Sequence, residues 1–222
     1  MVADGAGTRS MAREPLDRAR VVQGGIEIAD AEGVGALSMR HLARHLGYEA
    51  MSLYNHVANK DELLALMVDD VAGEIDPIDP DDAPLAAVRA LAVSLHEVLV
   101  RHPWSADLWQ RQFPGSHRVQ LMEDLLRLFA ESGLSPDLGH HGFHAVTNHV
   151  LGYTIQQIGM ADALPLDDAE TIARDFIATL EPEAFPRMIA HVHEHLAGKT
   201  ESSFELVLDL ILDGLVRLDA ER

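Results

Sequence analysis

The chain has 222 residues, 47% of them hydrophobic, and no cysteine, which leaves enough apolar surface for a sizeable core but excludes disulfides, cysteine-ligated zinc and thiol catalysis. No apolar run approaches the roughly 20 residues that cross a bilayer, and the N-terminus lacks the apolar stretch of a secretion signal, so we expect a cytoplasmic protein with no membrane partner. The net charge is −19, yet the first 60 residues carry seven basic and seven acidic side chains, so this end can still bind a polyanion.

The first expected helix spans residues 15–32. Pro15 suits the first helical position, and Val22, Ile26 and Ala29 share one face of a helix. Gly33 then ends the helix. We expect this helix to brace the segment that follows, because that segment is too short to bury a core of its own.

Residues 38–57 carry the pattern of a helix-turn-helix. Ser38 can cap a short helix, and Gly47 can end it in a left-handed conformation. A second short helix is expected over residues 50–57, with Leu53 and Val57 facing inward. The second helix of such a motif enters the DNA major groove. The apolar face of the first helix consists of Met39, Leu42, Ala43 and Leu46.

A segment rich in proline and aspartate, residues 76–84, predicts the domain boundary, with a DNA-binding domain over 1–75 and a second domain over 76–222. No segment alternates polar and apolar residues as a strand does, so the predicted class is all-α. It comprises an N-terminal three-helix helix-turn-helix domain and a larger C-terminal helical bundle that dimerises. The further expected helices span 59–75, 84–102, 116–132, 136–161, 168–180, 186–196 and 201–220, and a short segment over 104–112 lies between the second and third of these.

Two helices, 136–161 and 201–220, have more apolar surface than the single stripe of a surface helix. We therefore expect each to bury one face in its own core and another against a second copy of the chain. The alternative is that both are central core helices. The predicted dimer residues are Val150, Ile155, Phe204, Leu208, Ile211, Leu212 and Leu215.

The segment 36–64 resembles the DNA-binding motif of the TetR family of transcriptional repressors. The matching run reads LSMRxLAxxLG and then SLYxHVxxKxELL. The C-terminal two thirds are similar to the ligand-binding domain of the tetracycline-repressor branch, at Gly133–Pro136, His149–Gly152 and Leu206–Leu218.

This resemblance implies a set of DNA contacts. Arg40 would read a base, since arginine can donate two hydrogen bonds to guanine. Ala50 and Met51 would pack on thymine methyl groups, and Ser52 and Lys60 would hold phosphates. The alternative for each residue is a solvated helix surface. The other predicted DNA-binding residues are Tyr48, Glu49, Tyr54, Asn55 and His56.

The second domain carries polar side chains along the expected helix 136–161, with aromatic and flexible apolar residues upstream. Apolar walls with a few polar anchors are typical of a ligand pocket, although a hydrogen-bonded core network is an alternative. The predicted ligand-binding residues are His102, Trp104, Trp109, Phe113, Met122, Leu126, His144, Asn148, Leu151 and Gln156.

The resemblance departs from the tetracycline-binding pattern at two places. Ile75 lies near the position of the histidine that anchors the drug in that branch. The loop expected to carry a metal-binding histidine reads Ser105–Trp109, without one. We therefore expect an apolar or aromatic effector that binds without metal or cofactor.

The run His191–His195 matches the H-x-x-E-H pattern of some zinc peptidases, and its two outer histidines share a helical face. No clear third ligand accompanies it, so we do not expect an enzyme. The sequence thus predicts a ligand-responsive repressor that binds a palindromic operator as a homodimer and is released by a small molecule. One alternative is a DNA-binding regulator controlled by a protein partner, and a remote one is a metal-dependent hydrolase.

Overall fold

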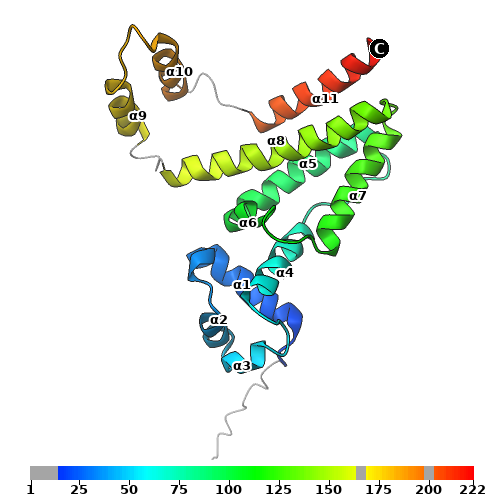
Figure 1. Cartoon of the computed structure of the whole chain (residues 1–222), viewed down its shortest axis with the longest axis vertical. Coiled ribbons are helices and arrows are strands. Elements are labelled where there is room, and N and C mark those ends of the chain that lie inside the picture. The colour runs from blue at the N-terminus through cyan, green and yellow to red at the C-terminus, as the bar shows by residue number, and fades with distance from the viewer. Residues whose placement is uncertain (1–14, 164–168, 198–202) are drawn as a thin grey trace, which may run out of the picture. The chain divides into compact units, whose positions relative to one another are not determined.

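The computed structural model describes residues 15–163, 169–197 and 203–222, and within these ranges it is helical with no strand (Figure 1). The predicted all-α class is confirmed. The N-terminal elements are α1 (Arg18–Glu32), the 3-10 turn η1 (Val34–Ala36), α2 (Met39–Leu46), α3 (Ala50–Leu53) and α4 (Lys60–Ala72). The later elements are α5 (Pro84–Arg101), α6 (Pro103–Leu108), α7 (Ser116–Glu131), α8 (Pro136–Ala163), α9 (Ala169–Ala178), α10 (Pro186–Leu196) and α11 (Phe204–Ala220).

Short polar side chains determine where several helices begin. Asp17 accepts a hydrogen bond from the backbone N–H of Arg20 at 2.8 Å, so α1 begins at Arg18 rather than at Pro15 as expected. Ser38 caps α2 in the predicted way. Ser203 accepts from the backbone N–H of Leu206 at 3.2 Å and caps α11.

The N-terminal part, residues 1–63, forms one compact unit in which α1 packs against α2 and α2 packs against α3. A Cβ atom on Gly24 would lie 2.7 Å from the Leu46 side chain, so α1 and α2 approach closely at this glycine. The core of the unit is apolar and includes Val21, Val22, Ile26, Ile28, Leu37, Leu42, Leu53 and Val57.

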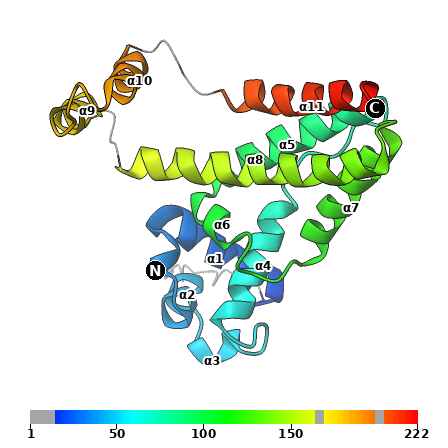
Figure 2. The same cartoon turned by 45° about the horizontal axis from the view of Figure 1, so that its top comes forward.

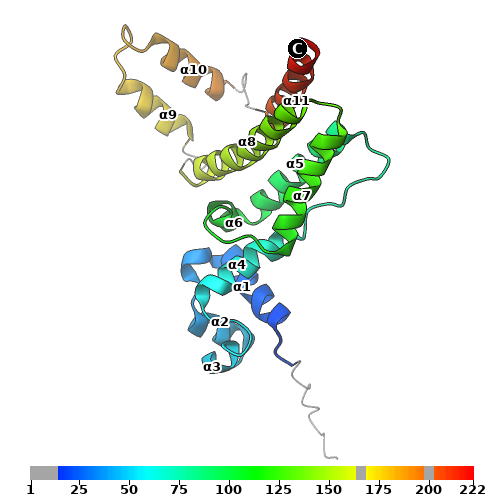
Figure 3. The ribbon, with the colours of Figure 1, turned by 45° about the vertical axis from the view of Figure 1, so that its right-hand side comes forward.

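The second unit, residues 64–222, is centred on α8, which packs against α5, α7 and α11. Figure 2 shows α11 running alongside α8, and Figure 3 shows α5 beside α7. A Cβ atom on Gly142 would lie 2.6 Å from the Phe129 ring and 2.9 Å from Leu215, so three helices meet at this glycine. Phe129, Leu99 and Leu208 are among the fully buried side chains here.

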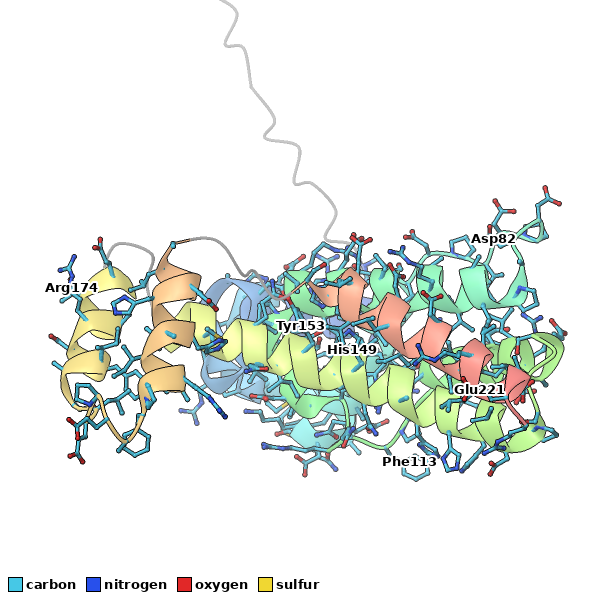
Figure 4. The ribbon with its side chains drawn as sticks, turned by 90° about the horizontal axis from the view of Figure 1, so that it is seen from above. Asp82, Phe113, His149, Tyr153, Arg174 and Glu221 are labelled. Carbon is cyan, nitrogen blue, oxygen red and sulfur yellow. The ribbon has the colours of Figure 1, made fainter. Side chains whose placement is uncertain are left out.

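An aromatic cluster anchors the start of α11. The Phe204 ring stacks on His96 of α5 with centroids 4.1 Å apart and on His149 of α8 at 4.8 Å. Tyr153 contacts the same ring edge-on at 5.4 Å, and Figure 4 shows His149 and Tyr153 at the junction of α8 and α11. The Thr154 hydroxyl donates to the Val150 carbonyl and lies 2.8 Å from His96 Nδ1, so His96 donates to Thr154. Burial lowers the pKa of His96.

Ion pairs hold both ends of α11. Arg89 donates to Asp209 at 2.6 Å and to Glu205 at 2.7 Å, near the first half of the helix. At the other end, Arg222 donates to Asp137 at 3.0 Å. Together with the aromatic cluster, these contacts fix α11 along α5 and α8.

The compact units divide at Leu63 and Leu64, within α4, so α4 belongs to both. The predicted boundary at residues 75 and 76 lies a few residues beyond the end of this helix, where the chain has no helix until Pro84, and it stays a prediction. α9 and α10 pack against each other. Among the described residues, no helix has the length and apolar character that a membrane span needs.

Candidate DNA-binding surface and effector site

The turn between α2 and α3 is set by Gly47, which adopts φ 72°. Its N–H donates to the Arg44 carbonyl at 3.1 Å, and the N–H of Tyr48 donates to the Ala43 carbonyl at 2.8 Å. This pair of hydrogen bonds is the Schellman arrangement that ends many helices. The predicted helix-turn-helix is therefore present, with a fixed exit from its first helix.

The second helix of the motif is shorter than expected, because α3 covers only Ala50–Leu53 rather than residues 50–57. The chain continues as a tight turn, in which the N–H of His56 donates to the Leu53 carbonyl at 2.9 Å. The shorter hydrogen-bond spacing winds the backbone more tightly than an α-helix. This turn brings Val57 into the core, where 2% of its surface is exposed.

The predicted DNA-binding side chains lie at the start of α2, on α3 and in the turn after it. Met51 is 75% exposed and Tyr54 is 44% exposed, while Leu53 between them is fully buried. Arg40, Glu49 and Asn55 are also exposed, whereas Tyr48, Ala50, Ser52 and His56 are half-buried. Their contacts with DNA stay a prediction.

Lys60 differs from the other predicted phosphate ligands because its ammonium is engaged within the protein. Its Nζ donates to the Leu37 carbonyl at 2.6 Å, and the residue is half-buried. Asn59 accepts from the backbone N–H of Glu62 at 2.8 Å, and Glu62 pairs with Arg18 at 2.5 Å. These contacts join the first turn of α4 to α1 and to the segment before α2. Lys60 therefore holds the motif in place whether or not it also meets a phosphate.

The predicted ligand-binding residues divide into a buried and an exposed set. His102, Trp104, Trp109 and Leu151 are buried, with His102 Nε2 3.2 Å from a Glu74 carboxylate oxygen. The exposed set comprises Phe113, Met122, Leu126, His144, Asn148 and Gln156. Phe113 is 88% exposed, and Figure 4 shows it pointing away from the ribbon. The ten residues therefore do not line one enclosed cavity within this chain.

Four residues of the exposed set, Met122, Leu126, His144 and Asn148, lie on α7 and α8. Phe129 of α7 faces Gly139 and Gly142 of α8, and the two helices run in opposite directions from their connection. Leu126 and Met122 lie one and two turns before Phe129 and thus level with successive turns of α8. Those turns carry the exposed His144 and Asn148 side chains. α7 and α8 therefore each carry exposed side chains, apolar ones on α7 and polar ones on α8.

The exposed apolar residues of α11 lie on a different face from most of the predicted dimer residues. Val150, Phe204, Leu208, Leu212 and Leu215 are 9% exposed or less, because they pack inside their own protomer. Only Ile155, at 42%, and the half-buried Ile211 present surface. The outer face of α11 instead carries Leu206, Leu210, Val216 and Leu218, each 47–64% exposed. The sequence signal for Leu206 and Leu210 was their spacing of one helical turn, offset from the buried stripe.

The histidine-rich segments do not assemble a metal site in the part of the chain that the structure describes. No group of three or more His, Asp or Glu side chains there could hold a metal ion. His140 and His144 of α8 lie with ring centroids 4.7 Å apart, and both are exposed. In the H-x-x-E-H run, the His195 side chain lies outside the described residues.

Comparison with known proteins gives two family matches. Residues 21–67 match the family described as bacterial regulatory proteins, tetR family, and residues 76–218 match the tetracyclin repressor-like C-terminal domain. The chain is 35% identical over 213 residues to the HTH-type transcriptional repressor DrrR1 of Streptomyces coeruleorubidus, covering 91% of this chain and 78% of that protein. It is 27% identical to the class D tetracycline repressor protein of Escherichia coli, covering 88% and 94% of the two chains.

Solved structures agree with these matches. Apo ActR from Streptomyces coelicolor superposes with a TM-score of 0.74 at 30% identity, covering 93% of this chain and 98% of ActR. ActR in complex with actinorhodin gives a TM-score of 0.72 at 30% identity, with 91% and 98% covered. Both comparisons include the helix-turn-helix and the C-terminal bundle.

Proposed function

The chain belongs to the TetR family of bacterial transcriptional regulators, and we propose that it is a ligand-responsive repressor that binds a palindromic operator as a homodimer. The observation that carries this proposal is the helix-turn-helix, with Met51 and Tyr54 exposed around the buried Leu53 anchor. A regulator that binds DNA works where the chromosome is, which supports the cytoplasm as its location.

The exposed side chains support a division of roles on DNA. Arg40 can donate two hydrogen bonds to a guanine edge, and Met51 can pack on a thymine methyl group. Tyr54 can donate its hydroxyl to a phosphate and fix the orientation of α3. Residues 61–222 hold all of the net negative charge, which opposes loose binding to DNA. Affinity would therefore depend on these few contacts and fall steeply as salt is added.

The outer face of α11 supports a dimer. Leu206 and Leu210 are 58% and 64% exposed, and Ile155 of α8 is 42% exposed. Large exposed apolar side chains on packed helices are typical of an interface. A two-fold dimer would place the two reading helices about 34–36 Å apart, one turn of DNA, and so match a palindrome.

The exposed side chains of α7 and α8 support a small-molecule site that is completed by another chain segment or by a second copy. Met122 and Leu126 offer apolar surface, and His144 and Asn148 offer polar anchors. ActR, which is about 30% identical, has been solved with actinorhodin and with (S)-DNPA. We propose an apolar or aromatic effector, which would have to prefer the released state by about 5.5 kcal/mol to empty a nearly full operator.

The DNA-binding proposal is tested with a labelled duplex from the DNA flanking the protein's own gene, by fluorescence anisotropy across a salt series. Arg40→Ala and Tyr54→Ala should each weaken binding, by about 1–3 kcal/mol where a base contact is lost. Lys60→Ala is unsuitable here, because it also removes the hydrogen bond to Leu37.

Arg127→Ala is the matched control, since Arg127 is an exposed arginine of α7 that pairs with Asp124 and Glu131. It removes the same charge from outside the helix-turn-helix and should leave the affinity unchanged. Selective, salt-sensitive binding that only the helix-turn-helix variants weaken supports the proposal. Binding that all three variants weaken equally, or no selective binding in a random-sequence selection, contradicts it.

A regulator controlled by a protein partner is a second candidate, because the buried half of the predicted ligand set is already packed. His102 is hydrogen-bonded and Trp104 and Trp109 are buried, so among the predicted ligand-binding residues the exposed set is the one that offers surface to an effector. Titrating the DNA complex with actinorhodin and related aromatic compounds separates the two. Release of the duplex by such a compound, abolished by Met122→Asp, supports the small-molecule effector.

A further inference from the structure

Asp69 of α4 caps a helix other than its own. Its carboxylate accepts a hydrogen bond from the backbone N–H of Arg118 at 3.0 Å and another from the N–H of His117 at 3.2 Å. Both groups belong to the first turn of α7, whose own N-cap residue, Gly115, supplies no side-chain hydrogen bond. A carboxylate at this position also interacts favourably with the helix dipole. Asp69 is only 8% exposed, so water screens the contact weakly.

Two glycines leave room for the contacts that Asp69 and His117 make between α4 and α7. A Cβ atom on Gly115 would lie 2.3 Å from Asp69 Oδ2, so only glycine fits while Asp69 occupies the cap. A Cβ atom on Gly73 would lie 3.1 Å from the His117 ring. His117 Nδ1 lies 3.0 Å from the Asp69 carbonyl oxygen, which adds a second polar contact between α4 and α7.

Arg118 extends the connection to α6. Its guanidinium donates to the Trp109 carbonyl and, at 3.1 Å, to the Gln112 carbonyl, and it lies 4.9 Å from the centre of the Trp109 ring. Arg118 is 5% exposed, and the nearby charge of Asp69 offsets part of the cost of burying the cation. A continuous series of contacts thus runs from α4 through Asp69 and Arg118 to Trp109.

We infer that Asp69 is a positioning residue that fixes the second half of α4 to the α6–α7 segment and thereby sets the DNA affinity of the helix-turn-helix. This inference rests on the proposed function, because it assigns a regulatory role at the DNA-binding surface. α4 is one unbroken helix, and its first turn holds the helix-turn-helix through Lys60. Without the Asp69 contact, α4 would sample more orientations, and the entropy lost on DNA binding would weaken the complex.

The first experiment tests the contact by hydrogen exchange and by a double-mutant cycle on the full chain. Asp69→Ala removes both acceptor oxygens, and the Arg118 amide should exchange about tenfold faster, as the loss of one hydrogen bond implies. Gly115→Ala should lower the melting temperature when Asp69 is present. In the Asp69→Ala background it should have little effect, because the added Cβ atom no longer meets a carboxylate. Strictly additive effects would overturn the contact.

The second experiment measures Kd for the DNA flanking the protein's own gene. Asp69→Ala and Gly115→Ala open the same contact from opposite sides, and each should raise Kd about fivefold or more with an unchanged salt slope, since no phosphate contact is lost. Asp107→Asn, an exposed aspartate of α6, is the control and should leave Kd unchanged.

The outcomes separate the two levels of the proposal. Faster exchange at Arg118 with Kd within twofold of the unchanged protein overturns the regulatory role of Asp69. No selective DNA binding by the unchanged protein overturns the proposed function, and the regulatory role with it. The hydrogen exchange and the double-mutant cycle then still decide whether Asp69 joins α4 to α7.

Discussion

Replacing each of two glycines of α8 with alanine measures how tightly this helix is packed. Gly142 has no room for a side chain, because a Cβ atom would meet Phe129 at 2.6 Å and Leu215 at 2.9 Å. Forcing an extra carbon into such a core costs about 1–3 kcal/mol. Alanine also favours the helix by about 1 kcal/mol relative to glycine. We therefore expect Gly142→Ala to destabilise the protein by up to about 2 kcal/mol.

Gly152 is the matched control, since a Cβ atom there has no neighbour within 4 Å and the residue is exposed. Gly152→Ala gains the same helix propensity without the clash and should stabilise the protomer by about 1 kcal/mol. Comparing the two variants cancels the propensity and isolates the clash with Phe129. For a chain of this size, 1 kcal/mol shifts the melting temperature by about 2–4 °C.

Thermal unfolding followed by circular dichroism, repeated over a tenfold range of protein concentration, measures both variants. Equal melting temperatures for Gly142→Ala and Gly152→Ala would refute the close packing of α8 against Phe129. If Gly152→Ala instead lowers the melting temperature only at high concentration, the face of α8 that carries Gly152 is buried between two copies. That result would place this glycine in the proposed dimer interface.

Three further predictions follow from the same helices. Burial lowers the pKa of His96, so the folded protein favours the neutral imidazole. The free energy of unfolding should therefore be level above the unfolded pKa near 6.5 and decline as the pH falls through the lower folded value. Urea unfolding at several pH values should show that His96→Gln reduces this decline. Ser38→Ala should cost about 1 kcal/mol in urea unfolding, because it removes the cap of α2, whereas Ser116→Ala, an exposed serine of α7, should cost less than about 0.5 kcal/mol. Leu208→Ala should cost about 2–5 kcal/mol, while Leu210→Ala should barely change the unfolding of the protomer and should weaken its self-association in analytical ultracentrifugation.

The helix-turn-helix was predictable because its signals are local. Ser38 and Gly47 act on backbone groups within a few residues, so the bounds of α2 follow from the sequence alone. The end of α3 does not, because the chain tightens there to bury Val57 in a core built from distant residues. A local pattern therefore predicted the motif and its inward residues but overestimated the length of its second helix.

The residues predicted for the dimer interface show a different limit of prediction from sequence. In α11, the stripe with Phe204 and Leu208 and the stripe with Leu206 and Leu210 are both apolar. Periodicity shows that α11 has two apolar faces, but only the packing against α5 and α8 shows which face is buried within the chain. Local sequence rules do not distinguish the two faces, because nothing near α11 in the sequence identifies the helices that it packs against.

The effector site was least predictable, because its polar residues have partners far away in the sequence. His102 was expected to contact a ligand, yet its imidazole lies 3.2 Å from Glu74, which follows α4. Two more contacts join this stretch to the bundle: Asp69 caps α7, and Ser94 donates to Asp76 at 3.0 Å. Arg101 also donates to Glu74 at 3.1 Å, so the residues after α4 are joined to α5 by contacts that no local pattern near His102 predicts.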